Sequence, residues 1–327
     1  NKFLFSIPNL IDYSVPKGNS SFDNLEIKLY NSSNKISNNN FDEFILSNIN
    51  NFIDFEMSSL TSGSGFVFLK EGIATLHRAL GNYMLDVHVN VNGYKEIYPP
   101  FLVNEKSMYS TGHFPKFYYD QFKIEDEDLW LIPTGEVVLA NLARNKTFNH
   151  CDLPLKYVTK TPCFRKEKGS YGKMVKGMIR QHQFEKVELL QITEPIDSYK
   201  ALDEIVFHAE SILKGLDLSY RVISLCEKDI GFSSTKTYDL EVWFPMKKTY
   251  IEVSSCSNTE SFQSVRMNSK FKNKFSNSND FVHILNGSGL AIGRVLMAII
   301  ENYFENNKIV IPNSLKKYMG NSSNVYI

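Results

Sequence analysis

The chain has 327 residues, of which 43% are hydrophobic and 13% aromatic, enough to bury one large core or two smaller ones. Its 36 basic and 36 acidic residues cancel, so no overall field draws the protein to nucleic acid or membrane, and any RNA contact must come from local patches. The cysteines are far apart and form no CxxC pair, which indicates neither a disulfide framework nor zinc: Cys151, Cys163, Cys226 and Cys256. The longest apolar run, residues 295–300, is too short to span a bilayer. We therefore expect a soluble protein of the reducing cytoplasm.

The first part of the chain predicts little regular structure before a long helix. Residues 1–40 form an extended opening segment, broken by Pro8 and Pro16, that ends in a polar loop of Asn and Ser. Apolar residues then recur at helical spacing over residues 73–89. Alternation over residues 94–98 predicts a short strand that a pair of prolines stops.

The rest of the chain alternates between strand and helix patterns. Alternating apolar and polar residues predict four strands, over residues 155–164, 183–192, 237–244 and 250–256. Helical spacing predicts helices over residues 199–216 and 290–303, the second one buried and preceded by glycines, and the Lys-rich residues 270–280 predict a solvated loop. Strands joined without regular intervening helices favour an α+β fold, with an antiparallel sheet flanked by helices. We expect a single domain over residues 41–327.

A long hairpin over residues 161–188 carries the most informative side chains. Two sets each share one face of a strand: Cys163, Arg165 and Glu167 on the first strand, and His182, Phe184, Lys186 and Glu188 on the second. If the two faces coincide, a cation, an aromatic ring and carboxylates converge, which suits a nucleotide that carries an amino acid. The alternative is a solvated hairpin with cross-strand ion pairs.

Two further segments could contact phosphate or metal. In YIEVSSCSN, Ile251 and Val253 share one face, and Glu252 and Ser254 share the other, for which a solvated polar surface is one interpretation. The alternative is that Glu252 and Ser255 offer hard oxygens of the kind that Mg²⁺ prefers. In NGSGLAIGR the glycines match no dinucleotide fingerprint. Arg294 is the only charge in residues 290–300 and requires an anionic partner, either a structural carboxylate or a nucleotide phosphate.

Together these segments resemble the motifs of class II aminoacyl-tRNA synthetases, and seryl-tRNA synthetases in particular. The resemblance covers essentially the whole chain and includes VPKG, PPFLVN, LIPTGEV, PCFRKEKGS, GMIRQHQFEKVELLQ, GFSSTKTYDLEVWFP, SSCSN, FQ and NGSGLAIGR. It implies a serine–tRNA ligase that activates L-serine with ATP to seryl-adenylate and transfers it to tRNA(Ser) or tRNA(Sec). It also implies a cytoplasmic homodimer, formed through residues 73–100, with no membrane contact.

The resemblance assigns site residues by position. The serine site would comprise Thr134, Gly135, Glu136, Glu188 and Ser288. The ATP site would comprise Arg165, Lys166, Glu167, Gln181, Phe184, Glu252, Val253, Ser254, Ser255 and Arg294. Within the second set Arg165, Glu252 and Arg294 would be catalytic, with Arg165 on the α-phosphate and Arg294 on the γ-phosphate, and Glu252 and Ser255 would hold Mg²⁺. The serine pocket resembles the zinc-free form of the family, so no zinc is expected.

The chain departs from the family pattern at a few positions. Gly135 stands where the family has Ala, and a second group of departures follows SSCSN: Thr259, Glu260, Ser261 and Val265. In the hairpin loop, residues 173–177 read KMVKG where RDTRG is usual, which bears on tRNA handling.

Other readings of the family resemblance stay open. A tRNA-gripping coiled-coil arm normally precedes the catalytic domain, and we expect it to be absent here, so that the chain forms adenylate at normal rates but charges tRNA poorly. One alternative function is a paralogue that passes activated serine to a carrier protein. Another is a catalytically silent RNA-binding paralogue.

Overall fold

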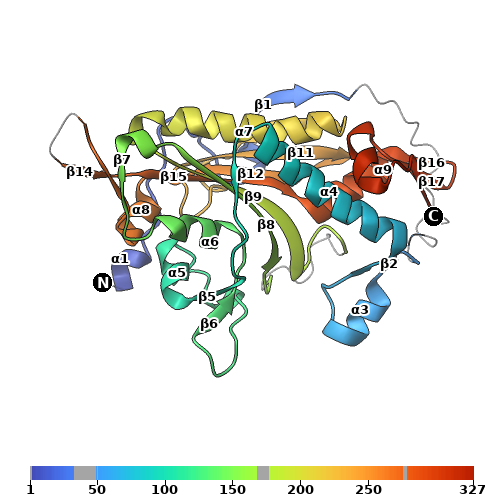
Figure 1. Ribbon diagram of the computed structural model, residues 1–327, viewed down its shortest axis with the longest axis horizontal. Coiled ribbons are helices and arrows are strands. Elements are labelled where there is room, and N and C mark those ends of the chain that lie inside the picture. The colour runs from blue at the N-terminus through green and yellow to red at the C-terminus, as the bar shows by residue number, and fades with distance from the viewer. Residues whose placement is uncertain (1, 33–48, 50, 168–176, 275–277) are drawn as a thin grey trace.

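The structure is a computed structural model that describes residues 2–32, 49, 51–167, 177–274 and 278–327. Its centre is an eight-stranded sheet flanked by helices (Figure 1), which confirms the predicted α+β class. The strands lie in the order β1 (Leu25–Tyr30), β10 (Tyr220–Ser224), β11 (Lys236–Phe244), β12 (Thr249–Asn258), β15 (His283–Ala291), β9 (Gln183–Thr193), β8 (Leu155–Phe164) and β4 (Lys95–Glu96). All neighbours are antiparallel except β4 and β8.

Three long helices cover one face of this sheet. They are α4 (Glu71–Asn90), α7 (Ser198–Gly215) and α9 (Ile292–Tyr303). Leu76 of α4, Ile205 of α7 and Leu296 of α9 are fully buried in one hydrophobic core with the strands. Each helix turns an apolar stripe toward the sheet, because residues three or four apart share one face of a helix.

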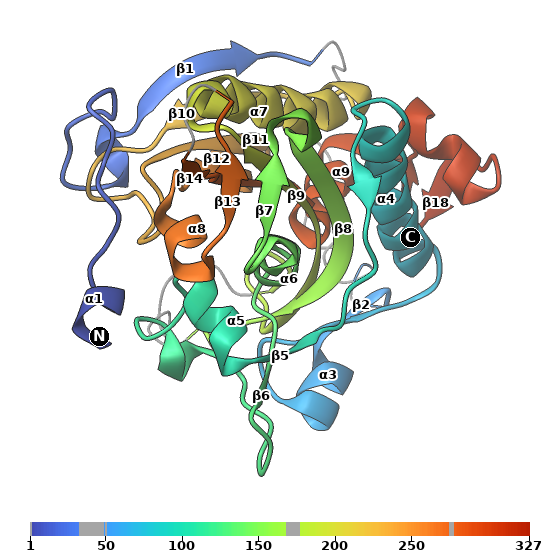
Figure 2. The same ribbon diagram turned by 60° about the vertical axis from the view of Figure 1, so that its left-hand side comes forward.

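Shorter elements complete the fold and gather largely on the opposite face (Figure 2). The short helices are α1 (Lys2–Phe5), α3 (Phe55–Ser62), α5 (Glu105–Ser110), α6 (Glu136–Ala140) and α8 (Phe262–Met267). The 3₁₀ turns are η1 (Ser21–Asp23), η2 (Tyr118–Asp120), η3 (Asn141–Ala143), η4 (His150–Asp152), η5 (Pro195–Asp197) and η6 (Asn313–Met319). Small sheets are formed by β2 (Ile53–Asp54) with β3 (Phe68–Leu69), by β5 (Leu102–Asn104) with β6 (Leu129–Leu131), by β7 (Thr147–Asn149), β13 (Lys270–Lys272) and β14 (Asn279–Phe281), and by β16 (Phe304–Glu305), β17 (Lys308–Val310) and β18 (Asn324–Tyr326).

Strand β9 divides the core between the two faces. Leu189 packs into the core beneath the long helices, whereas Leu190 and Ile192 pack into a second core with Leu139 at the end of α6. Side chains two residues apart share a face, so Glu188 lies on the side of Leu190. The predicted site therefore lies on the face opposite the three long helices.

Two predictions about the later part of the chain were wrong. The last helix begins at Ile292, not at residue 290, because Gly287 and Gly289 lie inside strand β15. A Cβ at Gly287 would lie 2.3 Å from Ile205 Cγ2, so this glycine lets the strand approach α7 closely. In the tract predicted as a loop, residues 270–272 and 279–281 form strands β13 and β14.

The first forty residues also differ from the expected extended segment and loop. Residues 2–5 form the short helix α1, and residues 25–30 form β1, an edge strand of the main sheet. Residues 33–40 lie outside the described residues. The strand expected over residues 94–98 is confined to β4, which pairs in parallel with β8.

Candidate active site

A cavity of about 350 Å³ lies on the face opposite the long helices. Most of the residues assigned by resemblance line it: Thr134, Glu136, Arg165, Glu167, Gln181, Phe184, Glu188, Glu252, Val253, Ser255, Ser288 and Arg294. Three assigned residues, Gly135, Lys166 and Ser254, are not among the lining residues.

The β8–β9 hairpin brings its two polar faces together, as the sequence suggested. Cys163 lies opposite Phe184 in the register, and the Arg165 N–H donates to His182 O at 2.9 Å just beyond. Directly opposite residues of an antiparallel pair share a face. The Arg165 guanidinium consequently lies 5.3 Å from the centre of the Phe184 ring. His182 is the exception, because its ring bonds to Arg165 O and packs against Phe66 instead of lining the cavity.

The open end of the hairpin carries more charge than the sequence indicated. Arg180 lines the cavity and pairs with Glu167, its Nε donating to Glu167 Oε2 at 2.8 Å. Lys166 points elsewhere: its backbone N–H donates to Asp120 O, and its ammonium lies 5.6 Å from the Phe122 ring. Residues 168–176 of the intervening loop lie outside the described residues.

A bulge in strand β12 sets the orientation of the proposed metal ligands. Glu252 lies opposite Glu241, but the next opposed pair is Leu240 with Ser254, so the register shifts by one residue. Strict alternation would place Glu252 and Ser255 on opposite faces, whereas the bulge places both on the cavity side. The shared face expected for Glu252 and Ser254 was therefore wrong, whereas Ile251 and Val253 both pack against the main core as expected. Ser254 instead donates from its Oγ to Ser288 O at 2.6 Å and joins β12 to β15.

Arg294 pairs with a structural carboxylate, which is one of the two anionic partners that the sequence left open. Its Nη1 lies 3.3 Å from Glu252 Oε2 and donates to Glu252 O at 2.7 Å, and its Nε donates to Ile179 O at 3.1 Å. The side chain is 29% exposed, so the charge is only partly buried. It lines the cavity from the first turn of α9, where it can also face an anionic ligand.

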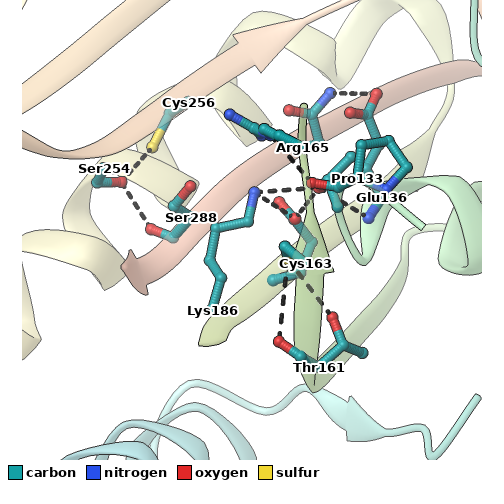
Figure 3. A network of polar contacts seen from close by, with 12 residues as sticks. Pro133, Glu136, Thr161, Cys163, Arg165, Lys186, Ser254, Cys256 and Ser288 are labelled. Carbon is teal, nitrogen blue, oxygen red and sulfur yellow. Dashed lines mark hydrogen bonds and ion pairs between the residues drawn. The ribbon is translucent and has the colours of Figure 1, made fainter. Parts of the chain in front are cut away.

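Three polar groups meet at the inner end of the cavity: Lys186, which is labelled in Figure 3, Glu188 and Thr134. Lys186 Nζ lies 2.6 Å from Glu188 Oε2 and donates to Thr134 Oγ1 at 3.0 Å. The Thr134 hydroxyl donates to the same carboxylate. Glu188 is 1% exposed, so its charge is compensated inside the protein.

A second carboxylate, Glu136, faces this cluster from the start of α6. It accepts hydrogen bonds from Gln263 Nε2 at 2.6 Å and from Asn286 Nδ2 at 3.0 Å. Burial and the neighbouring Glu188 carboxylate raise the pKa of Glu136 to about 7. The two acids are thus arranged so that a cationic ligand would stabilise both ionised forms.

Known proteins resemble this chain along nearly its whole length. The model of the tRNA synthetase class II core domain (G, H, P, S and T) matches residues 119–303. The serine–tRNA ligase of Coxiella burnetii (strain Dugway 5J108-111) is 48% identical over 320 residues, which are 97% of this chain and 76% of that protein. The chain belongs to the serine–tRNA ligase family.

Further members of this family agree in sequence and structure. The serine–tRNA ligase of Nitrosomonas eutropha is 48% identical over 334 residues, covering 98% of this chain and 76% of that protein. The crystal structure of seryl-tRNA synthetase from Pyrococcus horikoshii complexed with ATP superposes with a TM-score of 0.91 at 33% identity, over 99% of this chain and 77% of that one. The Giardia lamblia prolyl-tRNA synthetase structure, at 16% identity and a TM-score of 0.71, shares the fold.

Local patterns assign no role to several residues at the inner end of the cavity. The alternation of β9 places Lys186 on the cavity face but gives it no role. His113 lines the cavity from the loop after α5, and burial together with the cations Arg165 and Lys186 lowers its pKa to about 3, so it is neutral. The family motif FQ includes Gln263, which reaches Glu136 from α8. No local pattern signals that His113 lies in this cavity or that Gln263 meets Glu136.

The group of departures that follows SSCSN lies outside the cavity lining. Thr259 donates from Oγ1 to Ile284 O at 2.7 Å, and Glu260 Oε1 accepts from the Tyr199 hydroxyl at 2.9 Å. The same hydroxyl lies 2.9 Å from Asp12 Oδ2, so this corner attaches the opening segment to α7. Val265 is 52% exposed. None of these residues lines the cavity.

Metal-binding clusters and membrane-spanning helices are both lacking in the described parts of the chain. Across residues 2–32, 49, 51–167, 177–274 and 278–327, no three His, Cys, Asp or Glu side chains form a cluster that could hold a metal ion. The four cysteines are unpaired thiols in the same ranges. Within those ranges, no helix is long and apolar enough to cross a membrane.

Proposed function

We propose that this chain activates L-serine with ATP and transfers the seryl group to tRNA, and that the cavity is where both substrates meet. The observation that carries the proposal is that one cavity is lined both by groups that suit a nucleotide and by groups that suit an ammonium. Arg165, Phe184 and Arg294 suit a nucleotide, and Glu136 and Glu188 suit an ammonium group. The Pyrococcus horikoshii seryl-tRNA synthetase is complexed with ATP in its crystal structure, which supports a nucleotide site.

At the nucleotide end, the proposed roles follow the side-chain chemistry. The Phe184 ring offers a stacking surface for adenine, with Gln181 beside it and Glu167 at the rim. Arg165 would hold the α-phosphate, and Arg294 would hold the γ-phosphate. Because both guanidiniums line a partly enclosed space, their charge acts on phosphate with little screening by water.

Mg²⁺ fits the wall formed by Glu252 and Ser255. Asp239 lies opposite Ser255 in the register, and its buried Oδ1 has no hydrogen-bond partner in the described residues. Burial and the Glu252 carboxylate hold the pKa of Asp239 well above its ordinary value. A cation at Glu252 would relieve this repulsion. Two protein oxygens are enough to hold Mg²⁺, because water and substrate phosphates usually fill its remaining coordination positions. The ion would neutralise phosphate charge.

At the amino-acid end, the proposal places the serine ammonium near Thr134, Glu136 and Glu188. Ser288 is 8% exposed and closes the pocket from β15. A site with buried groups that await a hydroxyl can reject alanine by roughly 10⁴-fold, whereas threonine must be excluded by shape. Gly135 lies just behind the lining residues, where a Cβ would lie 3.0 Å from Glu188 Cβ.

The proposed reaction needs no protein nucleophile. The serine carboxylate attacks the α-phosphorus, a carboxylate–phosphate bond forms, and pyrophosphate leaves. Arg165 would stabilise charge on the α-phosphate and Arg294 charge on the leaving pyrophosphate, so positioning and electrostatics supply most of the rate. A terminal ribose hydroxyl of tRNA then attacks the activated carbonyl, and AMP leaves.

We extend the proposal to a cytoplasmic homodimer formed through residues 73–100. Val91 at the end of α4 is 76% exposed, and Tyr98 beyond β4 is 87% exposed. Exposed apolar surface is typical of a protein contact, and both side chains belong to the segment proposed to form it. Sedimentation of the protein, with Tyr98→Lys as the disrupting variant, tests this surface.

The experiment that tests the function is serine-dependent ATP–pyrophosphate exchange, followed by charging of tRNA(Ser). Exchange at normal rates, with tRNA charging that is measurable even if weak, is the expected result. Exchange without charging would favour the alternative in which a carrier protein accepts the serine. Absence of exchange in the folded protein would contradict the proposal and favour a catalytically silent paralogue.

A further inference from the structure

Lys186 is a buried lysine in the wall of the cavity. It lies on β9 between Phe184 and Glu188, with the same side-chain direction, and the residue is 8% exposed. Its Nζ is 2.6 Å from Glu188 Oε2 and 3.0 Å from Thr134 Oγ1. A carboxylate and a hydroxyl inside the cavity therefore hold the ammonium, which Figure 3 shows extending from β9 toward the side of Arg165 and Glu136.

These partners are the groups that the proposed function gives to serine. A lysine Nζ and the α-ammonium of an amino acid are chemically alike, since both offer N–H donors and a unit positive charge. Thr134 Oγ1 and Glu188 Oε2 cannot hold both ammonium groups in the same place. The unliganded protein thus keeps an ammonium of its own where the substrate's ammonium would bind.

The empty pocket needs such a cation. Glu188 is 1% exposed, and a buried carboxylate without a counter-charge is strongly unfavourable. Among the residues that the structure describes, the other side chains beside Glu188 cannot supply the charge: Glu136 is itself an acid, and burial keeps His113 neutral. Arg165 lies over Phe184 and donates from Nε to Pro133 O at 3.1 Å. Lys186 is consequently the cation that compensates Glu188 until a ligand arrives.

Serine brings both charges that an exchange requires. Its ammonium can replace the Lys186 ammonium on Glu188, while its carboxylate adds a negative charge beside the same wall. The flexible four-carbon stem of lysine lets the displaced ammonium move within the cavity. We infer that the Lys186 ammonium occupies the place of the substrate ammonium in the unliganded protein. When serine binds, its ammonium displaces that of Lys186, which then pairs with the serine carboxylate. This inference rests on the proposed function, because it takes the inner end of the cavity to bind serine.

Ethanolamine, which is serine without its carboxylate, provides the test. In the wild-type protein ethanolamine must displace Lys186 without offering it a new partner, so it binds much more weakly than serine. In Lys186→Met no displacement is needed, and we expect ethanolamine to bind at least about tenfold more tightly than to wild type, the scale of one charge-assisted hydrogen bond. Serine loses the partner of its carboxylate in this variant. The dissociation constant of ethanolamine divided by that of serine, both measured by calorimetry, should therefore be much smaller in this variant than in wild type.

Two further variants complete the design. Lys156→Met is the matched control, because Lys156 lies on the neighbouring strand and donates to Glu204 Oε1 at 2.7 Å outside the cavity; its ratio should equal that of wild type. Lys186→Gln replaces the methionine variant if that protein does not fold. A parallel loss of both ligands, or an unchanged ratio in a folded Lys186 variant, would overturn the inference. Wild-type protein that binds no serine would instead refute the proposed function, on which the inference depends.

Discussion

Glu136 should make serine binding depend on pH near neutrality. It lies at the inner end of the cavity, and burial with the Glu188 carboxylate raises its pKa to about 7 from an ordinary value of 4.5. Lys186 and Arg165 face it as cations, and neutral His113 does not titrate in this range. If the serine ammonium binds ionised Glu136, protonation of this carboxyl must compete with serine.

The size of the effect follows from the titration of one group. With a pKa of about 7, roughly half of the Glu136 carboxyls are ionised at pH 7 and roughly one in ten at pH 6. The serine KM should therefore rise about tenfold between pH 8 and pH 6, since each pKa unit corresponds to about 1.4 kcal/mol. Glu136→Gln keeps an acceptor for Gln263 and Asn286 but cannot titrate, so its serine KM should be higher at pH 8 and independent of pH.

The same shift has a consequence for the stability of the unliganded protein. Because the folded pKa lies above the ordinary value of 4.5, the folded state binds more protons than the unfolded state between about pH 4.5 and pH 7. The contribution of this group is fully present below pH 4.5 and is lost as the pH rises through 7, a loss of roughly 3 kcal/mol. Glu136→Gln should thus stabilise the protein at pH 8 and not at pH 4.5.

Pyrophosphate exchange at saturating ATP from pH 6 to pH 8.5 measures the serine KM, and urea unfolding at pH 8 and pH 4.5 measures the stability. A wild-type KM that stays flat over this range would refute the reasoning. So would a Gln variant that keeps the wild-type slope, because the titrating group would then lie elsewhere.

Three other predictions concern Gly135, the cations Arg165 and Arg294, and Glu252 as a proposed metal ligand. A Cβ at Gly135 would lie 2.9 Å from Thr159 Cγ2, so Gly135→Ala should lower kcat/KM for serine by about tenfold. Thr159→Ser removes that methyl group and should restore kcat/KM in the double variant. Additive losses in a double-mutant cycle would contradict this contact. Arg165→Ala and Arg294→Ala should each reduce serine-dependent exchange by at least about 10²-fold while circular dichroism stays unchanged, and near-normal exchange in either folded variant would remove that residue from the mechanism. Glu252→Gln should raise the Mg²⁺ concentration needed for half-maximal exchange by about tenfold or more, whereas a zinc-selective chelator should leave wild-type exchange intact; an unaltered Mg²⁺ requirement would argue against this ligand.

The regular parts of the fold followed from local patterns in the sequence. The strands β8, β9 and β11 lie within one residue of the ranges that alternation predicted, since a half-buried strand has a period of two whatever its neighbours are. The long helices α4 and α7 likewise carry their own apolar stripe. The family motifs, together with the shared faces of the hairpin, also indicated the side chains at the end of the cavity that is proposed to bind the nucleotide.

Tertiary structure alone decided where these patterns break and which distant residues meet. The bulge at Val253, which turns Glu252 and Ser255 toward the same cavity, depends on pairing with β11 and leaves no mark in the spacing of YIEVSSCSN. The strand that contains Gly287 exists because β9 and β12 pair with it, although its glycines suggested a helix start. The contact of Lys186 with Glu188 and Thr134 joins β9 to a loop about fifty residues earlier in the chain. Local sequence determines which residues can form a strand or helix, but the balance of charge inside a cavity depends on contacts between segments that only the folded chain brings together.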